Sequence, residues 1–353
     1  MPNTTSHPNP IGWFLISAAA ALVIALILAS DVGGPSGLLR VGEDFPIRPY
    51  IEADFPDVEL ASGLGHDGQQ YYGIARDPLG RGDVPDLVDN PSYRYLFILY
   101  PALAGGFGTF SPQLTVTTML ALSVVGFGLA GASALMLNHQ LGGRAIIANL
   151  AVANAGLFVS LFMTPDALAL GLAMLGVTLA VGGRDRPAAV ALALAVLAKT
   201  PYFVFPLALG VWAWQNQRAR LRWLTVAPAV PAAVWASYVF VRFGPSTSGN
   251  LDLPFRGLIR AIDKWGVLTG AELSMALVAL GLMVIGTVLA IRTRSRLLQA
   301  LVLGWVAVGA VSSMLIWVVG NNALRVMAPL WPLTAVAAAV YFSSNRSRRN
   351  LPV

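Results

Sequence analysis

The sequence predicts an all-α polytopic membrane protein with about ten transmembrane helices and a large extracytoplasmic first loop. Three observations predict this class. Hydrophobic residues make up 56% of the 353 residues and charged residues only 11%, whereas a soluble chain carries about 25% charged residues. The apolar residues form long runs, as expected of helices solvated by lipid. Short arginine clusters recur between these runs, which is the pattern that orients membrane helices.

The apolar runs define the predicted spans, because about 20 apolar residues are needed to cross roughly 30 Å of hydrocarbon. The first run is too long for a signal peptide and has no Lys or Arg before it, so we expect an uncleaved helix. Pro201 disfavours helix at the residue before it, which predicts a broken or tilted pair of helices there. The predicted spans are 11–30, 113–138, 145–163, 166–183, 187–200, 201–215, 223–243, 271–291, 297–319 and 323–343.

The arginine clusters fall in every second connection, and the positive-inside rule places these connections and both termini in the cytoplasm. The chain is thus predicted to be one domain, 1–353, in the cell inner (plasma) membrane. It would comprise an extracytoplasmic loop with a juxtamembrane helix (31–112), a transmembrane bundle (113–343) and a cytoplasmic tail (344–353). The apolar run 95–107 is too short to cross and is predicted to lie at the outer surface. The net charge of +6 reflects the same arginines, so the expected partners include membrane lipids and no nucleic acid.

The predicted outer loop carries most of the 17 acidic residues, between Asp31 and Asp89. Residues 65–78 read GHDGQQYYGIARDP, a carboxylate between glycines followed by two aromatic residues that suit a sugar. The segment 63–68 also matches G-x-G-x-x-G, but it lacks the flanking strand and crossover helix of a dinucleotide site. With no cysteine and three scattered histidines, thiolate chemistry is excluded and a histidine-built metal site is not expected. No cofactor is predicted, and a divalent metal ion on other ligands is left open.

Several short motifs follow one another in a characteristic order. After the first span and the acidic loop come a surface helix at 93–101, an outer turn at 164–167, a break at 198–201 and Arg325 at the start of the last span. This order resembles the GT-C superfamily of membrane glycosyltransferases. The stretch HDGQQYYGIA at 66–75, followed by ILYP at 98–101, resembles the bacterial relatives of the GPI-anchor mannosyltransferases. In that family a tryptophan usually precedes the aspartate, where this chain has His66.

The resemblance implies a GT-C-like fold and transfer of a hexose or pentose, mannose among them, from a polyprenyl-phosphate donor. The acceptor would be a glycan, lipid or protein on the extracytoplasmic face. The resemblance further implies that Asp67 is the general base that takes the acceptor's proton, with Asp54 and Asp57 as alternates. Lys199 and Arg325, the basic residues at short outer turns, would hold the phosphate. The other substrate-binding candidates are His66, Gln69, Tyr71, Tyr72 and Asp166.

Each candidate also has a purely structural interpretation. Lys199 and Arg325 could be anchors that snorkel to the interface, and Tyr71 and Tyr72 could belong to an interfacial aromatic belt. For Asp166 the favoured interpretation is a helix cap, because Thr-Pro-Asp is a good helix start. The alternative function is a polytopic transporter or lipid flippase, and a non-catalytic assembly partner is a third. Carriers place ionisable groups near the bilayer midplane, where the predicted spans hold almost none.

Overall fold

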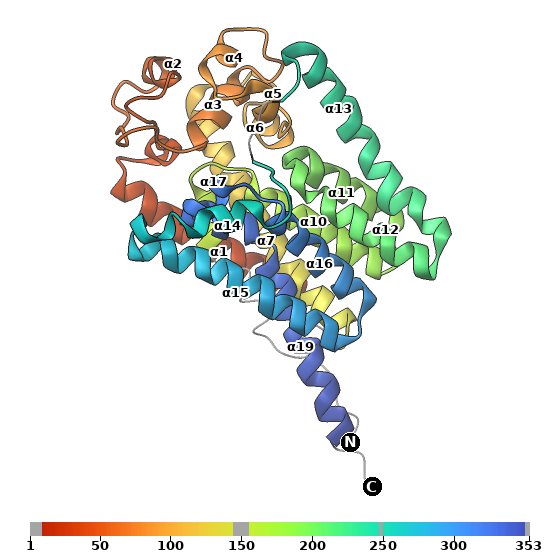
Figure 1. Ribbon diagram of the computed structural model, residues 1–353. Helices are drawn as coiled ribbons and strands as arrows, with labels where there is room; N and C mark the ends of the chain where they lie inside the picture. The colour runs from red at the N-terminus through yellow and green to blue at the C-terminus, as the bar shows by residue number, and fades with distance from the viewer. Residues whose placement is uncertain (1–8, 144–154, 247–249, 350–353) are drawn as a thin grey trace.

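The computed structural model describes residues 9–143, 155–246 and 250–349, and the regular elements of these residues are all helical (Figure 1). The α-helices in chain order are α1 (Pro10–Asp31), α2 (Arg48–Asp54), α3 (Gly68–Arg76), α4 (Val84–Leu87), α5 (Pro91–Arg94), α6 (Leu99–Ala104), α7 (Pro112–Gln140), α9 (Ala155–Phe158), α10 (Asp166–Val181), α11 (Asp185–Ala198), α12 (Val204–Asn216), α13 (Ala227–Phe243), α14 (Arg256–Ile262), α15 (Gly270–Thr293), α16 (Arg296–Ala310), α17 (Met314–Val318), α18 (Gly320–Met327) and α19 (Leu330–Arg349). The predicted all-α class is confirmed.

Among the described residues, four helices are long and apolar enough to cross a membrane. They are Pro10–Asp31, Pro112–Gln140, Arg218–Phe243 and Gly270–Thr293. A fifth crossing results if α18 and the first part of α19, which meet at an angle of 50°, form one bent span. Two further apolar helices, α10 and α16, are shorter. Large apolar side chains such as Leu26, Val234 and Val284 are exposed on these helices. The chain is therefore a membrane-embedded helical protein.

Two predicted spans near the C-terminus are not continuous helices. The run 297–319 is divided into α16 and α17, because the N–H groups of Asp252 and Phe255 donate to the carbonyls of Val311 (2.7 Å) and Ala310 (2.6 Å). These bonds replace the next helical turn. The run 323–343 begins earlier than predicted and bends between α18 and α19. Of the predicted span 145–163, residues up to 154 lie outside the described residues, and the rest forms α9 and a 3-10 turn at Val159–Leu161.

The break predicted at Pro201 is confirmed. Lys199 ends α11 in an extended conformation with φ −158° and ψ 110°, and a 3-10 turn at Thr200–Phe203 leads into α12. Pro201 has no N–H to donate to the carbonyl of Leu197, and its ring would clash with that carbonyl, so α11 cannot continue through this point. This break leaves the Lys199 side chain at a helix end rather than along a helix face.

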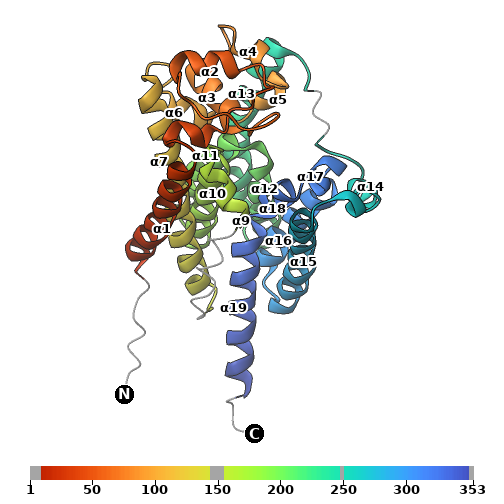
Figure 2. The ribbon, with the colours of Figure 1, turned by 90° about the vertical axis from the view of Figure 1, so that its left-hand side faces the viewer.

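Residues 32–111, which include the short helices α2 to α6, form what we call the cap. Both views place the cap at one end of the molecule, with α19 extending toward the opposite end (Figures 1 and 2). Tyr71, Tyr72 and Tyr95 of the cap are fully buried, in an apolar core that continues into the helix bundle. The run 95–107 supplies only the short helix α6, which does not cross.

Hydrogen bonds fix the cap to the helix bundle. The Trp235 indole on α13 donates to the carbonyl of Tyr95 (2.7 Å), and the Tyr238 hydroxyl donates to the carbonyl of Leu79 (2.8 Å). On the other side, the Tyr100 hydroxyl donates to the carbonyl of Met119 on α7 (2.8 Å). The position of the cap relative to α7 and α13 is therefore defined by bonds at both edges.

Helices α7 and α10 pack unusually closely. A Cβ atom at Gly126 of α7 would collide with the backbone of Ala167 and Leu168, in the first turn of α10. Small residues permit this kind of backbone approach in membrane helices. The close packing places the start of α10, and with it Asp166, beneath the cap.

Candidate functional site

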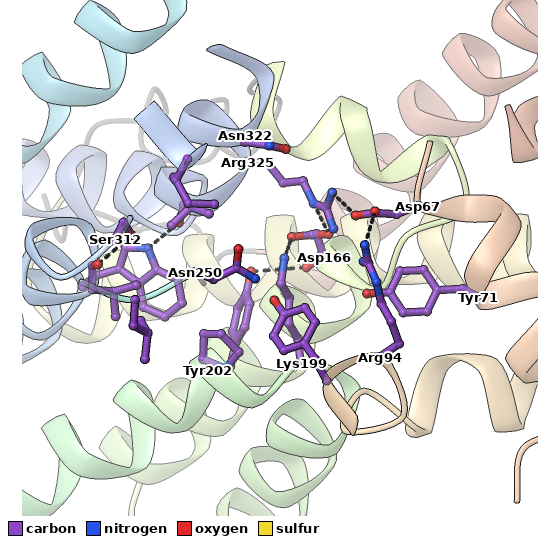
Figure 3. A pocket seen from close by; sticks show the side chains of 17 residues that line it. Asp67, Tyr71, Arg94, Asp166, Lys199, Tyr202, Asn250, Ser312, Asn322 and Arg325 are labelled. Carbon is purple, nitrogen blue, oxygen red and sulfur yellow. Dashed lines mark hydrogen bonds and ion pairs between the residues drawn. The ribbon is translucent and has the colours of Figure 1, made fainter. Parts of the chain in front are cut away.

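A pocket of about 190 Å³ lies between the cap and the helix bundle. Its charged side chains gather on one side, and Ser312 lies away from them (Figure 3). We call these charged residues the charged cluster: Asp67, Arg94, Asp166, Lys199 and Arg325. Four of the five are candidates from the sequence, and they come from positions far apart in the chain.

Asp67 stands at the end of the loop that leads into α3. Gly68 permits this placement, because a Cβ there would meet the carbonyl oxygens of Phe162 and Leu39. The two carboxylate oxygens have different partners: Oδ1 lies 2.9 Å from Arg94 Nη2, and Oδ2 lies 2.6 Å from Arg325 Nη1. Burial alone would raise the pKa of Asp67, but Arg94 and then Arg325 outweigh it and hold that pKa well below its usual value.

Asp166 is 1% exposed and lies at the centre of the charged cluster. Its carboxylate accepts from Lys199 Nζ, from Arg325 Nε (2.8 Å) and from the Thr164 hydroxyl (2.9 Å). The helix-cap interpretation is therefore wrong, since α10 begins at Asp166 while the carboxylate bonds to other side chains. An isolated buried carboxylate would be costly, and two cations offset that cost here.

Arg325 lies on α18 and joins the two carboxylates. Nη1 contacts Asp67 and Nε contacts Asp166, as the dashed lines of Figure 3 show. Arg325 is 9% exposed and Lys199 is 7% exposed. Neither side chain extends to an interface as a snorkelling anchor would. Both are buried parts of the pocket wall.

Arg94 is a member of the cluster that the sequence did not single out. It ends the four-residue helix α5, which follows Asn90 in a left-handed conformation (φ 59°). Its guanidinium contacts Asp67 on one side and Asp89 on the other, through Nε (2.6 Å) and Nη2 (2.7 Å). Several arginines occur in this part of the loop, and no local pattern distinguishes Arg94 from them.

The remaining lining of the pocket is neutral. It combines aromatic and aliphatic surface with amide and hydroxyl groups. The Trp305 indole donates to the carbonyl of Val326 (2.7 Å), and its ring packs against that of Tyr202 with centroids 5.1 Å apart. The neutral residues that reach the pocket include Tyr93, Tyr202, Asn250, Trp305, Ser312 and Asn322. None of these was expected from the sequence, because they become neighbours only through the tertiary fold.

Two candidates beside Asp67 have different surroundings. Gln69 is fully buried and serves the cap, since it accepts from the N–H of Gly42 (3.1 Å) and donates to the carbonyl of Leu64 (2.7 Å). His66 packs against the ring of Phe162 with centroids 5.8 Å apart. Burial lowers the pKa of His66 to about 4, so its imidazole is neutral at pH 7.

The two neighbouring tyrosines have opposite roles. Tyr71 lines the pocket, whereas the Tyr72 hydroxyl points away and donates to Asp54 (2.5 Å). Asp54 also lies 3.8 Å from Arg76, and Asp57 is exposed on the cap surface. Asp54 and Asp57, the alternates for the base, are therefore not part of the pocket.

Three cations and two carboxylates line the pocket, and Asp89, the third carboxylate bound to these cations, lies outside the pocket and is half-exposed. In the part of the chain that the structure describes, no three acidic or histidine side chains gather as a metal site would require. The carboxylates of Asp67 and Asp166 are already bound by cations. The arrangement suits an anionic ligand better than a cation.

Comparisons with known proteins assign no function to the chain. No family model matches the chain. No curated protein matches it, and no solved structure matches it.

Proposed function

We propose that the protein is a GT-C-type glycosyltransferase that moves a sugar from a polyprenyl-phosphate donor to an acceptor. One observation carries the proposal: Asp67, Asp166, Lys199 and Arg325, which the sequence resemblance selects separately, line one pocket. The acceptor would be a glycan, a lipid or a protein. The donor sugar would be a hexose or pentose, with mannose as the first choice.

The two walls of the pocket suit the two parts of such a donor. A phosphodiester carries one negative charge, and three cations face two carboxylates at the charged wall. A guanidinium can bind two phosphate oxygens at once, which favours Arg325 as the main phosphate ligand. The opposite wall offers apolar contacts from Leu251, Val308 and Ile316, which suit an isoprenoid chain.

In the proposed reaction Asp67 takes the proton of an acceptor hydroxyl. The hydroxyl oxygen forms a bond to the anomeric carbon of the sugar as the bond from that carbon to the phosphate oxygen breaks. Polyprenyl phosphate leaves with the electron pair, and Lys199 and Arg325 stabilise its charge. Asp166 touches neither reactant in this scheme, and it positions the two cations.

The proposal includes a topology of ten spans with both termini in the cytoplasm and the cap on the extracytoplasmic face. The arginine clusters support this orientation. So does the position of the cap, at the end of the molecule away from α19 (Figure 2). The chain has no cysteine, so single cysteines can test it cleanly. Asp263→Cys should react with an impermeant reagent from outside, and Arg292→Cys should react only after the membrane is opened. The reverse pattern would invert the topology.

A carrier or lipid flippase is the second candidate, and one observation favours it. Asp166, Lys199 and Arg325 are buried among helices that end in breaks, and buried ionisable groups on broken helices mark transport pathways. A carrier moves its substrate unchanged, whereas a transferase releases polyprenyl phosphate. The two functions therefore differ in product.

The deciding experiment uses the full chain in lipid nanodiscs with a panel of polyprenyl-phosphate sugars. We expect one of them to yield free polyprenyl phosphate and a glycosylated acceptor, with loss of both products in Asp67→Asn. Asp57→Asn is the matched control, because Asp57 is an exposed carboxylate of the same cap. Tight binding without any product, together with movement of intact donor across proteoliposomes, would establish the carrier instead.

A further inference from the structure

Both carboxylate oxygens of Asp67 are bound by cations in this structure. Each of its oxygens is paired with a different guanidinium, at 2.9 Å from Arg94 and 2.6 Å from Arg325. Such pairs favour the ionised carboxylate and make it a weak proton acceptor. The proposed function nevertheless requires Asp67 to take a proton. Opening one of the two pairs would make Asp67 a stronger base for that step.

The two arginines are held very differently on their far sides. Arg325 is bound to Asp166, a carboxylate that is only 1% exposed and that also binds Lys199. Arg94 is bound to Asp89, whose side chain is 50% exposed on the cap. Arg94 Nη2 is shared, since it contacts both Asp89 (2.7 Å) and Asp67 (2.9 Å). Arg94 can therefore leave Asp67 and keep its bond to Asp89 through Nε.

We propose that Arg94 is a positioning residue that holds Asp67 out of proton transfer and releases it when an anionic ligand enters the pocket. This inference rests on the proposed function. A phosphate oxygen is as good a partner for a guanidinium as a carboxylate oxygen, and Arg94 lines the pocket. As Nη2 turns to the phosphate, Asp67 keeps one cation instead of two and gains a negative neighbour. Both changes strengthen Asp67 as a base, so proton transfer is coupled to the presence of the donor.

Other groups near Asp67 do not provide the same control. His66 is neutral at pH 7 and so carries no charge to exchange, because burial lowers its pKa to about 4. Burial raises the pKa of Tyr71, which therefore also stays neutral. The groups that face Asp67 directly or through Arg325 are His66, Tyr71, Tyr93, Arg94, Asp166, Lys199 and Arg325. Of the three cations, Arg94 is the one with an exposed carboxylate as its second partner.

The protonation of Asp67 can be measured without a substrate. Dicyclohexylcarbodiimide modifies protonated carboxyl groups in apolar surroundings, and mass spectrometry of the Asp67 peptide gives the rate. Well above the pKa, a change of one pKa unit alters the protonated fraction about tenfold. The measurement uses the full chain in detergent at about pH 5, where an unperturbed aspartate is mostly ionised.

Two substitutions should change this rate in opposite directions. Arg94→Gln removes a cation, which should raise the pKa of Asp67 by about one to three units and the rate by about ten- to a thousandfold. Asp89→Asn leaves Arg94 to Asp67 alone and should lower the rate. Asp89 is half-exposed, so this variant should fold even where Arg94→Gln does not. Arg48→Gln, which breaks the exposed pair with Glu52 (2.8 Å), is the control and should leave the rate unchanged.

The ligand test uses methyl farnesyl phosphate, a phosphodiester with one fixed charge and an isoprenoid chain. Saturating probe should speed the modification of Asp67 in the wild-type protein and do so much less in Arg94→Gln. Equal ligand-free rates in wild type, Arg94→Gln and Asp89→Asn would show that Arg94 does not restrain Asp67. An equal effect of the probe in wild type and in Arg94→Gln would show that ligand binding does not act by releasing Asp67 from Arg94. Failure of the probe to bind would instead count against the proposed function, while the ligand-free rates would still decide the restraint.

Discussion

Asp67 of the charged cluster and Asp54 are two carboxylates of the same cap, and each lies near an arginine. The partners of Asp54, Tyr72 and Arg76, lie on one face of the nearby helix α3. The partners in the charged cluster come from the cap, α10, the break after α11 and α18. The Asp54 group pairs one anion with one cation, whereas the charged cluster holds three cations against two carboxylates beside a pocket.

This difference shows what distinguishes a binding site from a stabilising contact here. A contact that neutralises itself within one segment supports the local fold and offers nothing to a ligand. A cluster drawn from distant segments, with three cations and two carboxylates gathered at a pocket, carries a desolvation cost that packing alone does not explain. An anionic ligand would give the cations that line the pocket a further partner. Matched substitutions in the charged cluster and around Asp54 test this difference.

The largest difference is expected for stability. Asp166→Asn leaves Lys199 and Arg325 buried with one carboxylate fewer, and loss of one partner from a buried pair costs about 3–5 kcal/mol. Asp54→Asn removes a bond at a partly exposed site and should cost about 1 kcal/mol. Thermal unfolding in detergent measures both. Equal losses in the two variants would mean that burial does not separate the two regions.

The next difference is expected for turnover. Asp67→Asn keeps the side-chain shape and removes the proton acceptor, so transfer should fall by about a hundredfold or more while donor binding persists. Asp54→Asn should retain near-normal transfer, because Asp54 lies outside the pocket. Rates of polyprenyl phosphate release with saturating donor provide the measurement. A large loss in Asp54→Asn with none in Asp67→Asn would move the base to the other region.

Substitutions of Arg325 and of Arg76 should differ in their effect on donor binding. Arg325→Lys keeps the charge but loses the two-pronged contact, and loss of a charge-assisted bond of about 1.5–3 kcal/mol weakens binding roughly ten- to a hundredfold. Arg325→Ala should weaken it further. Arg76→Lys, beside Asp54, should bind polyprenyl phosphate as wild type does. The affinities are compared at fixed salt, and identical values in all four proteins would remove the phosphate role of Arg325.

The last difference is expected from pH. Burial lowers the pKa of His66 to about 4 in the folded protein, below the value of about 6.5 for an unfolded chain. The unfolded state therefore binds the proton more readily. The contribution of neutral His66 to the free energy of unfolding is complete above about pH 6.5 and is lost as the pH falls toward 4. The slope is at most about 1.4 kcal/mol per pH unit for one proton. His66→Gln should flatten the fall in melting temperature between these values, and an unchanged slope would show that His66 is solvated.

The sequence could predict features with a local cause. Apolar runs predicted the helical membrane class, and Pro201 predicted the break that places Lys199 at a helix end. Span continuity was overestimated at 297–319, because the bonds from Asp252 and Phe255 that end α16 are tertiary. Asp166 was expected to be a cap, since its partner Arg325 lies 159 residues away in the sequence. Tyr71 and Tyr72 were treated alike, although consecutive helical residues point about 100° apart. Arg94 was missed, since only the fold brings it to Asp67.

The order of the cluster along the chain has a consequence for how the protein is made. Ribosomes deliver Asp67, Arg94, Asp166 and Lys199 to the membrane well before Arg325, which lies on α18 near the C-terminus. Until α18 is translated and inserted, Asp67 and Asp166 each lack one of their cations. Because an uncompensated buried carboxylate is costly, the early helices should stay loosely assembled around water during synthesis. A nascent chain stalled before α18 would carry most of the membrane helices and yet have no pocket, so insertion of the last helices completes the site.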